Sequence, residues 1–273
     1  MQSYQIRQLQ LGGVLDQALS LTKNHLKPLL AIVIITLTPF TLITNVIMTI
    51  IAPMPVMPPN PTPEDMQVFM DGFIKTMKLL GIVVLPSMLA TAVCNAAVVR
   101  AISDVYLGKS FSPMSAIRQA FSRILPLFGT WVLFALAYLA GCMLCLIPGI
   151  LVLLWYSLST QIVVIEGTSG MAALNRSKAL MKGNVGNYIG LLVVIGMASV
   201  AINFVVGVIP QPHVQIVAMA AAQAILTVFT SAAMVVFYFS TRCQHEQFDL
   251  QLLADNIGSE FVLEADDDDR SAE

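Results

Sequence analysis

A few side chains in this sequence carry groups that could do redox or metal chemistry. Cys142 and Cys145 have the Cys-x-x-Cys spacing of zinc sites and redox pairs, and Cys243 and His245 form a Cys-x-His. Neither pair is followed by a second pair at metal-ligand spacing, although a structural zinc site takes about four ligands. The pattern favours small packing residues, and we predict no metal and no cofactor.

Acid–base and nucleophilic chemistry is no better supported by the sequence. The three histidines, His25, His213 and His245, lie in different regions. Gly-x-x-x-x-Gly-Lys, His-Glu-x-x-His and Gly-x-Ser-x-Gly motifs are all missing from the sequence. The acidic run Asp266–Asp269 is typical of a solvated, disordered end. We therefore predict no enzymatic activity and assign no catalytic residue.

The elements around these side chains are strongly apolar. Charged residues make up 11% of the 273-residue chain, against roughly 25% in soluble domains. The net charge is −2, and the four aspartates of the tail account for more than that, so the remainder is slightly basic. No broad basic surface indicates a nucleic-acid partner. The composition predicts an integral membrane protein with several spans.

The stretch from Ile124 to Ile165 carries no Asp, Glu, Lys or Arg and contains Gly141, Pro148 and Gly149 near its middle. One span takes about 20 apolar residues, so this stretch predicts two spans joined by a tight turn. The whole chain predicts an all-α membrane bundle with six spans, at about 28–52, 79–101, 125–146, 148–166, 188–209 and 214–240.

The basic residues divide unequally between the two sides of the predicted membrane. With a cytoplasmic N-terminus only Lys75 and Lys78 of the 14 basic residues lie outside. Because basic residues concentrate on the cytoplasmic side, we predict that both termini are cytoplasmic. The predicted domains are a lead-in of 1–27, a membrane domain of 28–241 and an acidic tail of 242–273.

An amphipathic segment precedes each odd-numbered span. These segments are 11–27, the stretch after Ser112 and Pro113, and the stretch from Ser169 to Lys182, and we expect interfacial helices there. The candidate contacts to lipid headgroups are Arg118, Arg123, Arg176, Lys178 and Lys182. Such side chains attract anionic phospholipid. The alternative is that they only anchor the topology.

The largest predicted outer segment, 53–78, is rich in proline and precedes the second span. Proline at this density favours extended polyproline II structure. Two interpretations stay open, a recognition arm for an external partner and a stiff connector.

Five amide side chains, each in a different predicted span, are candidates for a common polar site. These are Asn45, Asn95, Gln161, Asn203 and Gln223. They could line a polar groove between the helices or form interhelical hydrogen bonds. Glu166, at the end of the fourth span, is a candidate partner for Arg176 or Lys178.

Two segments resemble a known family. The first comprises Pro148–Ile150, Glu166–Gly167, Ala173–Ser177 and Leu180–Asn184. The second is the closing stretch from Phe237 to Leu250, with Tyr238, Arg242, Glu246 and Phe248–Leu250. They are similar to the YciC-like superfamily of bacterial six-span proteins, also known as the membrane domain associated with glycerophosphoryl diester phosphodiesterase. The resemblance implies a bacterial cytoplasmic-membrane protein. The soluble phosphodiesterase barrel of that family, with its His-Arg-Gly opening, has no counterpart here.

Two functions remain open at the level of sequence. The first is a non-catalytic protein that organises membrane lipids, including anionic phospholipid, or holds an unidentified membrane-protein partner. The second is a transporter, channel or lipid translocator with a polar groove between its helices. The basic interfacial segments favour the first, and the amides in the spans favour the second.

Overall fold

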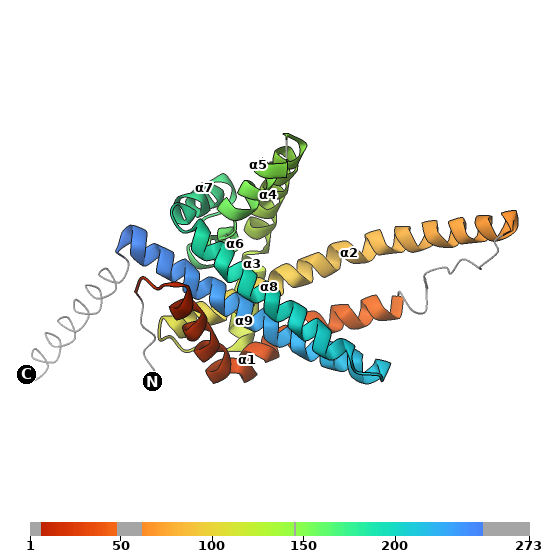
Figure 1. The fold of residues 1–273 in the computed structure, drawn as a ribbon, viewed down its shortest axis with the longest axis horizontal. Helices are drawn as coiled ribbons and strands as arrows, with labels where there is room; N and C mark the ends of the chain where they lie inside the picture. Colours follow the sequence, from red (N-terminus) through yellow and green to blue (C-terminus); the bar gives the residue numbers. More distant parts are fainter. Residues whose placement is uncertain (1–6, 48–61, 145, 248–273) are drawn as a thin grey trace, which may run out of the picture.

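A computed structural model describes residues 7–47, 62–144 and 146–247 of the chain. In these stretches every regular element is a helix, which confirms the predicted all-α fold class (Figure 1). The helices are α1 (Leu11–Val46), α2 (Pro63–Tyr106), α3 (Pro113–Ser122), α4 (Ile124–Leu144), α5 (Leu146–Trp155), α6 (Ser159–Ile165), α7 (Gly170–Met181), α8 (Val185–Gly207) and α9 (Pro212–Glu246). Cys145 and the predicted acidic tail from residue 248 lie outside the described stretches.

Six segments of the described chain are long and apolar enough to cross a membrane. They are Leu11–Thr41, Pro63–Tyr106, Ile124–Leu144, Ile147–Ile165, Val185–Gly207 and Val214–Glu246. A multi-pass membrane protein is therefore the class that the helices support, as the sequence predicted.

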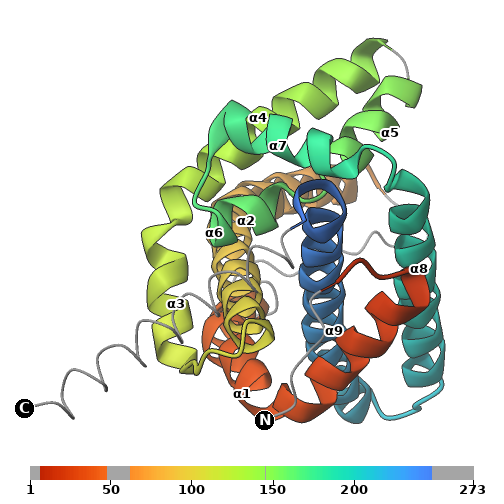
Figure 2. The ribbon, with the colours of Figure 1, turned by 90° about the vertical axis from the view of Figure 1, so that its left-hand side faces the viewer.

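Helix α1 contains both the predicted interfacial segment and the first span. It bends at His25, where φ is −120° and ψ is 20°, three residues before Pro28. Proline has no N–H and its ring clashes with the carbonyl of the residue four positions earlier, so the helix bends just there. The first half of α1 consequently lies across the ends of the other helices (Figure 2). This is the orientation expected of an interfacial helix.

Helix α2 begins earlier than the sequence predicted. The predicted outer loop of 53–78 is helical from Pro63 onward, and residues 53–61 lie outside the described stretches. Thr62 Oγ1 accepts a hydrogen bond from Asp65 N (3.2 Å), and Asp65 Oδ2 accepts one from Thr62 N (2.9 Å). This capping box, with proline at the first helical position, starts the helix. The predicted outer loop is therefore wrong over 63–78, which is helical.

The second half of α1 and helices α2, α8 and α9 run along the long axis of the molecule (Figure 1). The inner half of α9 supplies much of the core, since Val228, Ala233 and Val236 are fully buried. Phe239 stacks on Tyr106 of α2, with ring centroids 5.2 Å apart. We call the end where α2 and α9 end and α8 begins the basic end, because Arg100, Arg176 and Arg242 lie there.

Helices α4 and α5 form a hairpin that runs crosswise to the long helices (Figures 1 and 2). The two helices touch through small residues, because a Cβ on Gly141 would lie 3.0 Å from the Gly149 backbone. Away from this contact the hairpin is open, and Leu125, Met143 and Leu144 are more than 80% exposed. Apolar side chains this exposed require cover from lipid or protein.

The predicted fourth span, 148–166, is not one continuous helix. It breaks between Trp155 and Ser159 into α5 and α6. The buried Ser177 of α7 bridges the break, since its Oγ accepts a hydrogen bond from Leu158 N (3.1 Å) and donates one to Trp155 O (2.8 Å). A side chain from elsewhere in the chain thus replaces part of the lost helical bonding, which allows an interruption inside an apolar segment.

Candidate functional site

The loop between α6 and α7 sets the position of the basic residues that follow it. Gly167 and Gly170 both have positive φ, at +77° and +65°, a conformation that glycine adopts at little cost. Gly170 N donates to Thr130 Oγ1 of α4 (2.8 Å), which fixes the start of α7 against α4. Helix α7 therefore has a defined orientation on the basic end, and its polar side chains point to defined partners.

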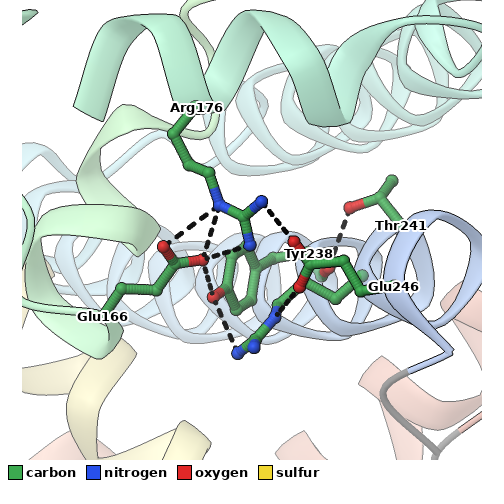
Figure 3. Close-up of polar contacts among 6 residues, drawn as sticks. Glu166, Arg176, Tyr238, Thr241 and Glu246 are labelled. Carbon is green, nitrogen blue, oxygen red and sulfur yellow. Dashed lines mark hydrogen bonds and ion pairs between the residues drawn. The ribbon is translucent and has the colours of Figure 1, made fainter. Parts of the chain in front are cut away.

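Arg176 lies between two carboxylates, those of Glu166 directly after α6 and Glu246 on α9 (Figure 3). Its Nε donates to Glu166 at 3.2 and 3.3 Å, and its Nη1 forms an ion pair with Glu246 of α9. The hydrogen bond to Glu246 raises the pKa of Arg176 above its ordinary value, while partial burial acts in the opposite direction and Glu166 adds to the increase. Arg176 is therefore charged at every physiological pH.

Tyr238 and Arg242, both on α9, form hydrogen bonds with the two carboxylates that pair with Arg176. Tyr238 donates its hydroxyl proton to Glu166 Oε1 (2.7 Å), and Arg242 Nε donates to Glu246 Oε2 (3.0 Å). Arg242 Nη1 also donates to the Tyr238 hydroxyl at 3.4 Å. We call Glu166, Arg176, Tyr238, Arg242 and Glu246 the arginine network.

The arginine network balances its own charge, with two carboxylates and two guanidinium groups. Its charged side chains are between 17% and 29% exposed, so they are largely removed from solvent. A carboxylate that accepts bonds from guanidinium groups is stabilised in its ionised form and is a poor proton acceptor. The arrangement ties α6, α7 and α9 together and is suited to holding structure rather than to acid–base chemistry.

The predicted headgroup contacts separate into different environments. Arg176 belongs to the arginine network, and the pairing of Glu166 with Arg176 that the sequence left open is present. Lys178 instead lies over the ring of Trp155, 4.4 Å from its centroid. Arg118 and Lys182 are exposed on α3 and beyond the end of α7. Arg118, Lys178 and Lys182 are thus exposed and form no ion pair with another described residue.

Arg123, the fifth predicted residue, lines a small polar cavity of about 140 Å³ at the basic end. The polar side chains around it are Arg100, Gln119, Ser122 and Arg123, and we call this cavity the polar pocket. Arg100 pairs with Asp104 through Nε and Nη2, which leaves Nη1 outside that pair. Arg123 Nη1 donates a long hydrogen bond to Gly167 O (3.4 Å). The pocket therefore holds two guanidinium groups against one nearby carboxylate.

The five amides predicted to form a groove have different surroundings. Asn203 is exposed and donates to Ser199 O of its own helix (2.7 Å), and Gln223 contacts Met219 Sδ at 3.9 Å on its own helix. Asn95 is half-buried, and the side chain of Asn45 lies outside the described part. Gln161 is buried, and its Oε1 has no hydrogen-bond partner among the described residues. Asn203 and Gln223 thus bond within their own helices.

Sequence reasoning did not single out the α9 members of the arginine network as site residues. Tyr238, Arg242 and Glu246 are spaced four residues apart, which places them on one face of a helix. That spacing was a usable signal, whereas the pairing with Arg176 depends on how α7 folds back. No family model, curated protein or solved structure matches the chain.

Proposed function

We propose that this chain is a non-catalytic integral membrane protein that binds and orders anionic phospholipid. The proposal includes membership of the YciC-like superfamily, a bacterial cytoplasmic membrane and cytoplasmic termini, as the sequence predicts. One observation carries it: α3, α7 and the first half of α1 lie at the basic end (Figure 2), and α3 and α7 carry the exposed basic residues Arg118 and Lys178.

The proposal depends on basic side chains that form no ion pair with another described residue. Arg118, Lys178 and Lys182 are exposed. A Lys or Arg near a membrane surface attracts anionic lipid by roughly 1 kcal/mol. Three such residues on short interfacial helices are enough to enrich anionic lipid several-fold around the basic end. The arginine network supports this surface by holding α7 in place.

Lipid selectivity tests the proposal. The protein is reconstituted into vesicles that contain phosphatidylcholine and a small fraction of spin-labelled phosphatidylglycerol or spin-labelled phosphatidylcholine. We expect a larger immobilised fraction for phosphatidylglycerol, and a smaller difference for the triple variant R118Q/K178Q/K182Q. Equal immobilisation of both lipids by the unaltered protein would contradict the proposal.

A second candidate, a transporter or lipid translocator, is favoured by the interrupted fourth span. Interrupted helices frequently form substrate sites in transporters, and the unpaired Gln161 Oε1 lies in α6, next to the break. This candidate predicts that Gln161→Leu abolishes substrate or lipid movement across vesicles without loss of stability. The non-catalytic proposal predicts that Q161L is at least as stable as the unaltered protein, because it removes an unpaired buried acceptor, and that lipid selectivity is unchanged.

A further inference from the structure

We propose that the basic end holds one specific anionic glycerophospholipid, with its phosphate in the polar pocket and its two acyl chains in two neighbouring apolar grooves. This inference rests on the proposed function and adds to it a defined site. Both grooves are lined by residues of α2 and by Ile124 at the start of α4. One has a volume of about 420 Å³ and the other of about 240 Å³.

The phosphate position follows from the charges of the polar pocket. Arg100 and Arg123 bring two guanidinium groups, and Gln119 and Ser122 bring neutral hydrogen-bonding groups. Within the described stretches the Arg123 guanidinium donates one long hydrogen bond, to Gly167 O at 3.4 Å, and the side chain is exposed, so it can turn toward an anion at small cost. Asp104 remains the partner of Arg100 Nε and Nη2. A phosphodiester is the anionic group of a membrane lipid that matches guanidinium donors.

The acyl-chain positions follow from the residues that line the two grooves. The larger groove lies between α1, α2 and α3 and includes Thr36, Pro86, Ile117 and Phe121. The smaller groove lies between α2 and α4 and includes Met88, Ala92, Phe128 and Trp131. Leu89 and Ile124 line both grooves. They form a ridge between the two spaces, and a lipid with two chains fits one chain on each side of such a ridge.

The spacing between headgroup and chains agrees with lipid dimensions. Ile124, which lines both grooves, directly follows Arg123, which lines the polar pocket. Along α2, Leu89 precedes Arg100 by about 16 Å at the helical rise of 1.5 Å per residue. Half of a hydrocarbon core of about 30 Å is about 15 Å. Leu89 thus lies near the depth that the end of an acyl chain reaches when its phosphate lies at Arg100, so the space between these two levels has about the length of one chain.

The test uses the full chain, purified in mild detergent and titrated with phosphatidylglycerol under native mass spectrometry. The unaltered protein is expected to retain one phosphatidylglycerol per chain, and the double variant R100Q/R123Q to bind it about tenfold more weakly. The control R118Q/K182Q removes two exposed charges whose side chains do not line the polar pocket. It is expected to retain one phosphatidylglycerol per chain, although it weakens the general preference for anionic lipid. Equal retention by both double variants would overturn the site.

A second measurement uses only the unaltered protein, in case R100Q/R123Q folds poorly. Phosphatidylglycerol with a diazirine in the second half of one acyl chain should label residues 86–93 of α2 and 124–131 of α4. Labels spread evenly over all six apolar segments would overturn the site. Excess inorganic phosphate should leave the lipid in place, and displacement by phosphate alone would mean that the pocket holds an anion without chains.

Failure of this inference differs from failure of the proposed function. If spin-labelled phosphatidylglycerol shows a preference that R100Q/R123Q and R118Q/K182Q reduce equally, the proposed function stands and the specific site is wrong. If no preference exists and no phosphatidylglycerol is retained, both are wrong.

Discussion

The arginine network and the polar pocket lie at the same end of the molecule, but their arginines differ in how far nearby carboxylates neutralise them. In the arginine network, Arg176 and Arg242 face two carboxylates and a tyrosine hydroxyl, so the charge is balanced inside the protein. In the polar pocket, among the residues that the structure describes, Arg100 pairs with one carboxylate and Arg123 donates to a carbonyl. The number of basic residues at a membrane surface therefore does not give the charge available to lipid. Only the pocket and the exposed side chains retain it.

The two regions meet at adjacent residues of one loop. Glu166 accepts hydrogen bonds from Arg176 and Tyr238, and Gly167 O accepts one from Arg123. We infer that the arginine network holds the loop that orients Arg123. Changes in the arginine network should lower stability first, whereas changes in the polar pocket should lower lipid binding first.

The largest effect is expected from Arg176→Ala. The substitution leaves Glu166 and Glu246 partly buried with a single arginine, Arg242, between them. Removing one partner of a buried ion pair costs roughly 3–5 kcal/mol. Because these side chains are still 17–29% exposed, we expect about 2 kcal/mol. Thermal unfolding of the purified protein in detergent measures it, with Lys182→Gln as the control. Equal unfolding midpoints for R176A and K182Q would mean that the arginine network adds no stability.

Tyr238→Phe should have the next largest effect. It removes the hydroxyl that donates to Glu166 Oε1 at 2.7 Å but keeps the ring that packs against Phe239. The loss of a hydrogen bond to a charged acceptor is worth about 1.5 kcal/mol. Unfolding in detergent should show this loss while phosphatidylglycerol retention changes little. A loss of lipid larger than the loss of stability would contradict the division between the two regions.

Gly167→Ala should affect both regions. Its φ of +77° strains any other residue, and the new Cβ would lie 2.9 Å from Arg123 Nη1. We expect about 1 kcal/mol of destabilisation together with weaker lipid retention, because Arg123 is displaced. Gly108→Ala is the matched control, since Gly108 has φ +72° with nothing within 4 Å of its Cβ position. Both variants share the strain, so equal lipid retention by G167A and G108A would show that Arg123 is not involved.

The smallest effect is expected from R118Q/K182Q. Both side chains are exposed, so stability should change by less than about 0.5 kcal/mol. The general preference for anionic lipid in vesicles should fall, by roughly 1 kcal/mol per charge at most. A large loss of stability, measured by thermal unfolding, would mean that Arg118 and Lys182 support the fold as the arginine network does.

The sequence predicted the fold more fully than the site. Apolar runs, prolines and caps identified the six spans, α3 and α7, because these features act locally along the chain. The start of α2 at Pro63 was missed because the density of prolines indicated a loop, whereas the capping box of Thr62 and Asp65 starts a helix there. The break before Ser159 was missed because Ser177, which bridges it, lies in another helix. The polar pocket joins α2, α3 and α6, and no local pattern brings Arg100 near Arg123.

The most direct test of phospholipid binding at the basic end is thermal unfolding in detergent with increasing phosphatidylglycerol. A ligand that binds only the folded state stabilises it by about 2.7 kcal/mol at 100 times its dissociation constant. We predict a midpoint that rises with phosphatidylglycerol for the unaltered protein and for R118Q/K182Q, and a rise about half as large for R100Q/R123Q, because a tenfold weaker site gains about 1.4 kcal/mol under the same conditions. A constant midpoint for the unaltered protein, or an equal rise for R100Q/R123Q, would contradict the account.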